Sequence, residues 1–246
     1  MPKLASLKRL SAGQIVGWIF FILAASLVLW FLWRILYFTG LLRSGTAVYA
    51  LPQFSARTSS ILGTPILSAK KVSKSFLEDP ASPSLGDAIS PDLTIVEFAD
   101  FECPFSRNAS LTVRSLMAKY GDRVQIIFRH YPIETLHPGA GRVATAAACA
   151  NEQGKFWAYH DKAFAANSYT PDDLTRFAAE VGLDMATFER CLISGQAQVQ
   201  VQKDLEAART LGLRGTPTFM FDGQTVEGDI PPDVFESIIQ RFLTSK

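Results

Sequence analysis

The chain has 246 residues, of which 48% are hydrophobic and 19% are charged, and its formal net charge is +1. This length fits one domain of ordinary size together with an additional segment. The near-neutral charge and the lack of a basic stripe with interleaved aromatic residues argue against nucleic-acid binding. The sequence also has no internal repeat and no glycine loop of the kind that cradles phosphates.

An apolar stretch near the N-terminus predicts a transmembrane helix over residues 11–38. No residue between Arg9 and Arg34 is charged, and roughly 20 apolar residues are enough to cross a bilayer. Aromatic residues of the kind found at membrane interfaces lie near its ends: Trp18, Trp30, Trp33 and Tyr37. A buried soluble helix would need a polar face. A cleaved signal peptide would have an apolar region of about 7–15 residues that ends in small residues, so an uncleaved anchor is the preferred interpretation.

The distribution of basic residues predicts the orientation of this single span. Lys3, Lys8 and Arg9 precede the apolar stretch, whereas Arg34 and Arg43 follow it. This bias favours a cytoplasmic N-terminus at residues 1–10 and an extracytoplasmic C-terminal part, for example in a periplasm. Residues 39–84, which are rich in glycine, proline and serine, are then predicted to form a juxtamembrane linker.

The stretch Thr94–Ser110 carries the chemistry that the sequence predicts. The β-branched run Thr94–Phe98 is long enough for a buried strand, and a short turn follows. Pro104 suits the first turn of a helix, which places Cys103 at the helix N-terminus. Backbone N–H groups and the helix dipole there favour a nucleophilic thiolate. The alternative is a buried structural cysteine in front of an ordinary helix.

A second motif, Gly215–Phe221, places Thr216 and Pro217 before an apolar run, where a cis prolyl bond is often found in a tight turn. Together the two motifs resemble the DsbA-like branch of the thioredoxin superfamily, over residues 85–246. In that family the cis-proline loop faces the active cysteine and helps to hold the substrate peptide. The resemblance therefore implies that Thr216 and Pro217 lie beside Cys103.

The motif around the cysteine departs from the family at one position. The usual motif is Cys-x-x-Cys, but this chain has Ser106 in place of the second cysteine. Ser106 can still donate a hydrogen bond to a Cys103 thiolate, whereas intramolecular resolution of a mixed disulfide is lost. Pro104 and Phe105 are expected to contact substrate, although Phe105 has the alternative of packing onto the domain.

The rest of the pattern predicts an α/β, thioredoxin-like fold with a helical insertion, preceded by the transmembrane helix and the linker. A strand at 123–129 completes a βαβ unit with the first strand, which implies parallel pairing. Helical segments then occupy about 139–213, followed by two short strands and a final helix. The histidines, His130, His137 and His160, lack metal-ligand spacing with the cysteines, so no metal is expected. Each is predicted to be a surface or capping residue.

The other two cysteines, Cys149 and Cys191, fall in the helical insertion. In an exported domain they are expected to form one structural disulfide, which would close a loop of about 40 residues. Two buried free thiols are the alternative, because free cysteine packs like a small hydrophobic residue. A third possibility is that one of them resolves Cys103 as a distant partner, which requires Cα atoms within about 7 Å.

Glu97 lies within the otherwise apolar first strand. The DsbA-like resemblance implies a buried acid near the active cysteine that tunes its ionisation or relays protons, and Glu97 is the candidate. The alternative is a strand residue that faces solvent, and the alternation of the strand does not decide between the two.

These patterns predict a membrane-anchored, extracytoplasmic thiol–disulfide oxidoreductase with one active cysteine and no cofactor. Such an enzyme supports isomerisation or reduction of protein disulfides better than net oxidation. Its partners would be exported proteins that contain cysteines, together with a small thiol or a redox partner. The alternative is a non-catalytic thioredoxin-fold module that binds exported polypeptides or a membrane partner. A glutathione-transferase-like activity has no specific signal in the sequence.

Overall fold

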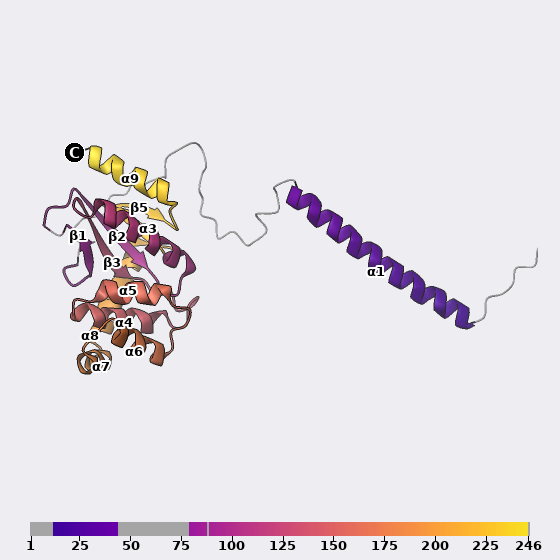
Figure 1. Ribbon diagram of the computed structural model, residues 1–246, viewed down its shortest axis with the longest axis horizontal. Coiled ribbons are helices and arrows are strands. Elements are labelled where there is room, and N and C mark those ends of the chain that lie inside the picture. Colours follow the sequence, from indigo (N-terminus) through magenta and orange to yellow (C-terminus); the bar gives the residue numbers. More distant parts are fainter. Residues whose placement is uncertain (1–11, 44–78, 88, 246) are drawn as a thin grey trace, which may run out of the picture. The chain divides into compact units, whose positions relative to one another are not determined.

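A computed structural model of the chain describes residues 12–43, 79–87 and 89–245. The chain divides into two compact units, residues 1–57 and 58–246. In the first unit, α1 (Ala12–Arg43) is a helix of 32 residues, shown in indigo in Figure 1. Among the described residues, no helix has both the length and the hydropathy that crossing a membrane requires. The predicted span over 11–38 is therefore not confirmed, and residues 44–78 of the predicted linker lie outside the described part.

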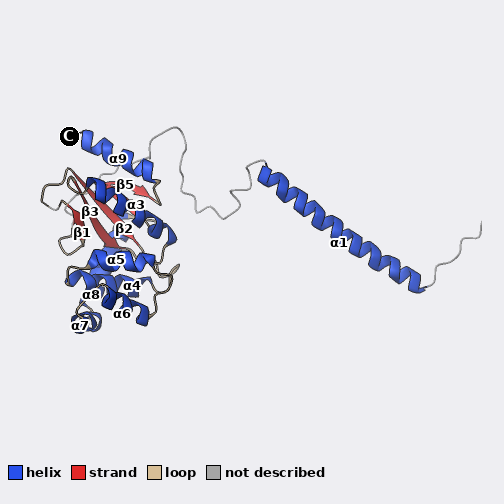
Figure 2. Ribbon diagram, viewed as in Figure 1, coloured by secondary structure: helices blue, strands red, loops and turns tan. Residues whose placement is uncertain are grey.

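The second unit is built on a five-stranded sheet with the order β1-β3-β2-β4-β5 (Figure 2). The strands are β1 (Ser84–Gly86), β2 (Leu93–Ala99), β3 (Val124–His130), β4 (Thr218–Phe221) and β5 (Gln224–Glu227). β2 is parallel to β3, as the βαβ pattern predicts, and every other pair is antiparallel. The edge strand β1 pairs with β3 and was not predicted from the sequence.

The central strand β2 is buried on both faces, which explains its nearly continuous apolar sequence. Leu93 and Ile95 pack on one face with residues of α3 (Pro104–Tyr120) and α9 (Pro232–Thr244). Val96 and Phe98 pack on the other face with residues of α8 (Gln196–Leu211). Helices therefore cover both faces of the sheet at its central strand.

Five helices, α4 to α8, form the insertion between β3 and β4. Those not yet given are α4 (Ala140–Glu152), α5 (Phe156–Ala165), α6 (Pro171–Glu180) and α7 (Met185–Ser194). The small side chains of α4 are nearly all buried, which lets the neighbouring helices pack close to its backbone. The thioredoxin-like fold with a helical insertion is thus confirmed.

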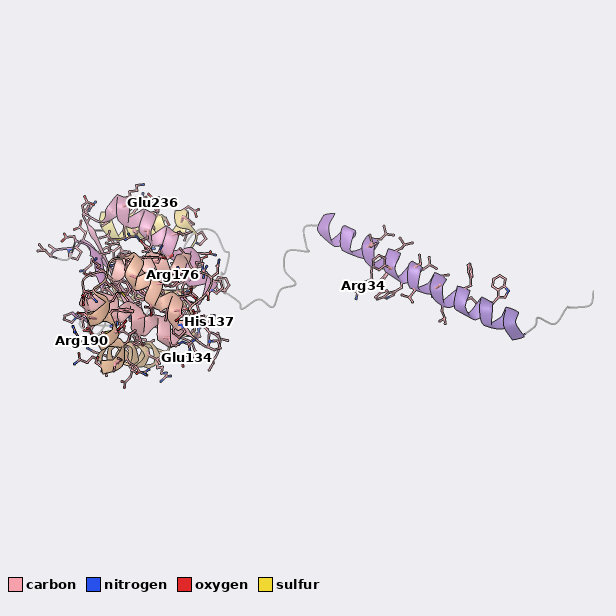
Figure 3. The ribbon with its side chains drawn as sticks, turned by 60° about the horizontal axis from the view of Figure 1, so that its bottom comes forward. Arg34, Glu134, His137, Arg176, Arg190 and Glu236 are labelled. Carbon is pink, nitrogen blue, oxygen red and sulfur yellow. A yellow bond between two sulfur atoms is a disulfide. The ribbon has the colours of Figure 1, made fainter. Side chains whose placement is uncertain are left out.

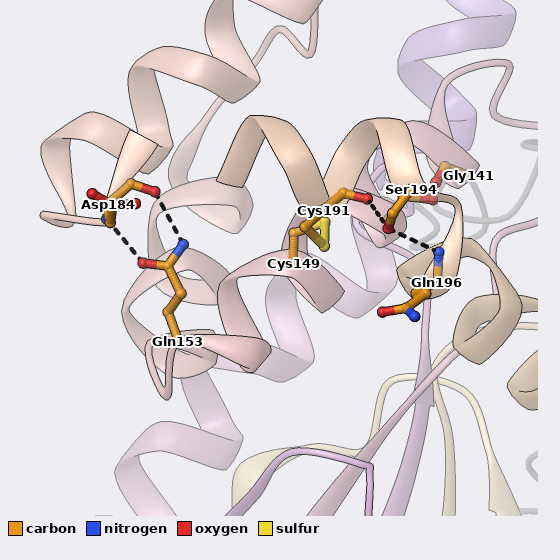
Figure 4. Close-up of a disulfide and its surroundings, with 8 residues drawn as sticks. Gly141, Cys149, Gln153, Asp184, Cys191, Ser194 and Gln196 are labelled. Atoms are coloured by element: carbon orange, nitrogen blue, oxygen red, sulfur yellow. Dashed lines mark hydrogen bonds between the residues drawn. A yellow bond between two sulfur atoms is a disulfide. The ribbon is translucent and has the colours of Figure 1, made fainter. Parts of the chain in front are cut away.

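Figure 4 shows a disulfide and a pair of hydrogen bonds that join the region of α4 to the region of α7. Cys149 and Cys191 are joined by a disulfide with an S–S distance of 2.05 Å and a Cα–Cα distance of 5.7 Å. Next to it, Gln153 Oε1 accepts a hydrogen bond from the Asp184 N–H at 2.8 Å, and Gln153 Nε2 donates to the Asp184 carbonyl at 3.2 Å. The hydrogen bonds to Asp184 hold the start of α7 against the end of α4, and the disulfide at Cys191 holds the second half of α7.

Removal of this disulfide is expected to destabilise the second unit. The bond separates residues that are 42 positions apart, and closing a loop of this length contributes about 4 kcal/mol in the chain-entropy model. The double variant Cys149→Ala, Cys191→Ala should therefore lose about that much free energy of unfolding, measured by urea denaturation. Cys103→Ala is the matched control, since Cys103 is not in a disulfide. Equal stability of the double variant and the wild type would contradict this prediction.

Candidate functional site

Cys103 is the N-cap residue of α3 and lies directly after the turn that leaves β2. Its N–H donates to the Asp100 carbonyl at 3.1 Å, and its carbonyl accepts from the Arg107 N–H at 3.0 Å. The residue is 5% exposed. Its Sγ makes no capping hydrogen bond to the first turn of α3; the thiol instead donates to the Thr216 carbonyl at 3.2 Å.

The loop that carries this carbonyl contains the cis peptide bond Thr216–Pro217. β4 follows it directly and pairs antiparallel with β2, with Thr218 opposite Phe98. This pairing brings the two motifs, which lie 113 residues apart in the sequence, into contact at one end of the sheet. The hydroxyl Oγ1 of Thr216 is buried without a hydrogen-bond partner in the described structure.

Ser106 has a different partner from the one the sequence predicts. It is fully buried, and its Oγ accepts a hydrogen bond from the Asp100 N–H at 3.4 Å. Cys103 donates to Thr216 here, as a thiol does and a thiolate does not. Donation from Ser106 to a Cys103 thiolate therefore stays a prediction.

The two residues that follow Cys103 at the start of α3 are both exposed to solvent. Pro104 is exposed, and Phe105 is 55% exposed. The exposure of Phe105 argues against the alternative in which this ring packs onto the domain. An exposed aromatic ring two residues from Cys103 is a candidate contact for an apolar part of a substrate.

Glu97 is fully buried on β2, which excludes the alternative of a strand residue that faces solvent. Neither carboxyl oxygen has a hydrogen-bond partner in the described structure. Burial raises the pKa of Glu97 to about 8, because desolvation disfavours the charged carboxylate. Glu97 is therefore predominantly protonated at neutral pH.

Two of the three histidines were predicted wrongly. His130 and His160 are buried rather than on the surface, and their rings pack in an aromatic cluster with Phe101, Phe128 and Phe156. Burial lowers the pKa of His130 to about 3 and also lowers the pKa of His160, because the cluster disfavours a charged ring. Both imidazoles are therefore neutral core residues, and the described residues contain no group of three or more metal-ligand side chains.

Asp100 is a buried residue near the site that the sequence did not single out. Its carboxylate accepts hydrogen bonds from the N–H groups of Glu102 and Ile133, at 2.9 Å and 2.8 Å. Its Oδ2 also lies 2.9 Å from His137 Nδ1. The one signal available in the sequence was an acid directly after a buried strand and three residues before the cysteine.

A helix-tip cysteine that faces a cis-prolyl loop at one end of a mixed sheet defines a thioredoxin-fold protein with a thiol site. A family model described as thioredoxin matches residues 78–241, and the chain belongs to this family. The resemblance to DsbA-like thioredoxin-fold proteins is thereby confirmed at the level of family and fold.

Several solved structures and curated proteins are similar to this chain. A thioredoxin-like oxidoreductase from Silicibacter pomeroyi is 30% identical, and the match covers 69% of this chain and 97% of that one with a TM-score of 0.63. The thiol-disulfide exchange protein alpha-DsbA2 from Wolbachia pipientis is 18% identical over 68% of this chain and 90% of its own, with a TM-score of 0.62. An antiporter named Na(+)/H(+) antiporter NhaA 3, from Salinispora tropica, is 34% identical over 154 residues. That match covers 62% of this chain and 24% of the antiporter, so the chain spans about a quarter of that curated relative.

The buried Glu97 makes a specific prediction for the pH dependence of stability. Its pKa is about 8 in the folded protein and 4.5 ordinarily, so the folded state holds a proton that the unfolded state loses first. Stability therefore falls as the pH rises from about 5 to 8, by on the order of 4 kcal/mol from this group. Glu97→Gln should remove this fall, as measured by urea denaturation at several pH values.

Glu180→Gln is the control for this experiment. Hydrogen bonds from Lys162 and Arg176 lower the pKa of Glu180. The contribution of Glu180 to the free energy of unfolding therefore changes only below the pH range that is measured. The control should keep the slope of the wild type. Parallel curves for the wild type and Glu97→Gln would contradict the prediction.

Proposed function

We propose that the chain is a membrane-attached, extracytoplasmic thiol–disulfide oxidoreductase that acts on protein disulfides through Cys103 alone. The observation that carries this proposal is the contact of Cys103 Sγ with the Thr216 carbonyl beside the cis bond to Pro217. The other two cysteines of the chain are joined to each other. No second thiol of the same chain is therefore left to complete a redox pair with Cys103.

The reaction follows from having one thiol. The Cys103 thiolate attacks one sulfur of a substrate disulfide, the S–S bond breaks, and the leaving sulfur departs as a thiolate that takes up a proton. The product is a mixed disulfide between Cys103 and the substrate. A second thiol, from the substrate or from a small molecule, then attacks the substrate sulfur and releases Cys103. When the attacking thiol belongs to the substrate, the number of disulfides is unchanged. When it belongs to a small molecule, the substrate is left as a mixed disulfide with that molecule, and a second molecule of the small thiol attacks this bond, which frees the substrate thiol and forms the disulfide of the small thiol.

The neighbouring residues have distinct roles in this proposal. Pro104 and Phe105 contact apolar parts of the substrate, because both are exposed next to the thiol. Thr216 and Pro217 hold the substrate backbone, and ionisation of Cys103 releases the Thr216 carbonyl for this purpose. Glu97 is protonated in the folded protein near neutral pH, and it is the candidate buried acid that tunes the ionisation of Cys103.

An extracytoplasmic location agrees with the chain's own chemistry, because a disulfide such as Cys149–Cys191 persists in oxidising compartments. Membrane attachment through α1 rests on the composition of that helix, and the orientation with the N-terminus inside rests on the basic residues Lys3, Lys8 and Arg9 in front of it. Large apolar side chains along it are exposed, for example Phe21 at 66%, Leu29 at 67% and Leu36 at 71%. Exposed apolar surface of this extent is typical of a membrane or partner contact.

Attachment is tested by fractionating cells that make the full chain or a chain that lacks residues 1–43. The full chain should remain with the membranes after alkaline carbonate extraction, because a buried apolar helix is not removed by high pH. The shortened chain should be found in the supernatant. Release of the full chain by carbonate would contradict the proposed anchor.

Restoring the missing cysteine tests the single-thiol mechanism. With a peptide that contains a disulfide, the wild type should accumulate a mixed disulfide at Cys103, because Ser106 cannot attack it. Ser106→Cys should shorten the lifetime of this species by at least about 100-fold, since a neighbouring thiol has a high effective concentration. Non-reducing mass spectrometry after acid quenching measures the mixed disulfide in the wild type and in Ser106→Cys. Cys103→Ala is the control that forms no mixed disulfide.

The outcome also separates the enzyme from a binding module. A wild-type chain that forms no adduct, but binds the peptide as tightly as Cys103→Ala does, would contradict the proposed activity and favour the module. Equal adduct lifetimes for the wild type and Ser106→Cys would contradict the assigned role of position 106.

A further inference from the structure

The carboxylate of Asp100 lies at the end of β2, three residues before the reactive cysteine, and its side chain is 0% exposed. The proposed reaction does not otherwise use it. Taking a carboxylate out of water is costly unless hydrogen bonds replace the lost solvation. The partners of Asp100 therefore indicate what this buried charge holds in place.

On one side, Asp100 fixes the turn that carries Cys103. Its Oδ1 accepts the N–H of Glu102 at 2.9 Å, and its carbonyl accepts the N–H of Cys103 at 3.1 Å. Its own N–H donates to Ser106 Oγ at 3.4 Å. These three bonds fix the backbone on both sides of the cysteine and tie it to the first turn of α3.

On the other side, Asp100 binds the loop between β3 and α4. Its Oδ2 accepts the N–H of Ile133 at 2.8 Å and lies 2.9 Å from Nδ1 of His137. Figure 3 shows His137 on the domain near Glu134, which belongs to the same loop. The two oxygens of one carboxylate therefore join two segments that are more than 30 residues apart in the sequence.

A second contact links the same two segments. A Cβ atom at Gly139 would lie 2.3 Å from Glu102 Oε1, so the Glu102 carboxyl rests against the N-cap residue of α4. Burial raises the pKa of Glu102, and the charge of Asp100 adds to this effect. Only a residue without a side chain admits the carboxyl here in its present place, which shows how closely the turn and the loop approach.

We propose that Asp100 is a positioning residue for Cys103: its buried carboxylate clamps the turn 99–103 to the loop 131–139 and thereby holds the thiol against the cis-prolyl loop. His137 is the solvent-side part of this clamp, since it is 20% exposed. The expected effect on disulfide exchange rests on the proposed function, whereas the joining of the turn to the loop by Asp100 does not.

The test uses the full chain with four substitutions: Asp100→Asn, His137→Ala, His137→Asn and Asp184→Ala. Asn at position 100 keeps the shape but replaces one acceptor oxygen with a donor. Asn at position 137 keeps an N–H group close to the place of Nδ1, whereas Ala does not. Asp184→Ala is the matched control, because it removes a carboxylate that accepts a backbone N–H at 2.8 Å in α7, within the insertion.

The readout is the rate of mixed-disulfide formation as a function of the concentration of a disulfide peptide. Asp100→Asn should lower the rate at saturation about tenfold with little change in the half-saturating concentration, because a displaced nucleophile reacts slowly while the peptide contacts remain. His137→Ala should lower it about threefold, the effect of one lost hydrogen bond. His137→Asn should restore the wild-type rate, and Asp184→Ala should leave it unchanged.

Several results would overturn the proposal. They are a wild-type rate at saturation in Asp100→Asn, an effect on the half-saturating concentration alone, or no difference between Ala and Asn at position 137. If Asp100→Asn does not fold, the His137 pair decides. If the wild type itself forms no adduct, the proposed function fails, but the clamp is still tested by hydrogen exchange of the Glu102 and Ile133 amides. Exchange in His137→Ala as slow as in the wild type would then overturn the clamp.

Discussion

The pairing of β2 with strands on both sides is the constraint on which the site depends. β3 lies parallel to β2 on one side, and β4 lies antiparallel on the other. The C-terminal end of β2, which leads to Cys103, therefore meets the N-terminal end of β4, which follows Pro217. A shift of one residue in the β2–β4 register would turn the buried side chains to the wrong face. The register that packs the core is thus the same one that brings the thiol to the prolyl loop.

Buried polar groups in this domain fall into two kinds that differ in how they are solvated. Asp100 and the ion pair between Arg129 and Asp204, with an N–O distance of 2.6 Å, have hydrogen bonds that replace water. Glu97 has none and is kept neutral instead, through its raised pKa. The first kind fixes the relative positions of strands, turns and helices. The second kind is a neutral carboxyl within the sheet, close in sequence to the turn that leads to Cys103.

Local patterns predicted much of this fold, whereas contacts between distant segments were harder to foresee. The strand at 94–98, the helix that begins after Cys103 and the helical insertion have periodic or capped sequences, and the structure contains them. β1 has only three residues and forms through its pairing with β3, so its own sequence is too short to predict a strand. The burial of His130 and His160 and the partners of Asp100 arise from tertiary packing, which no neighbouring residue in the sequence encodes.

The two edges of the sheet are both short, with three residues in β1 and four in β5. An edge strand exposes unpaired N–H and carbonyl groups that can recruit strands from other molecules. At the β5 edge, Glu227 is held in an ion pair with Arg214, and fixed charge at an edge discourages such recruitment. The short β5 edge and its ion pair therefore leave little length of strand on which another chain could pair.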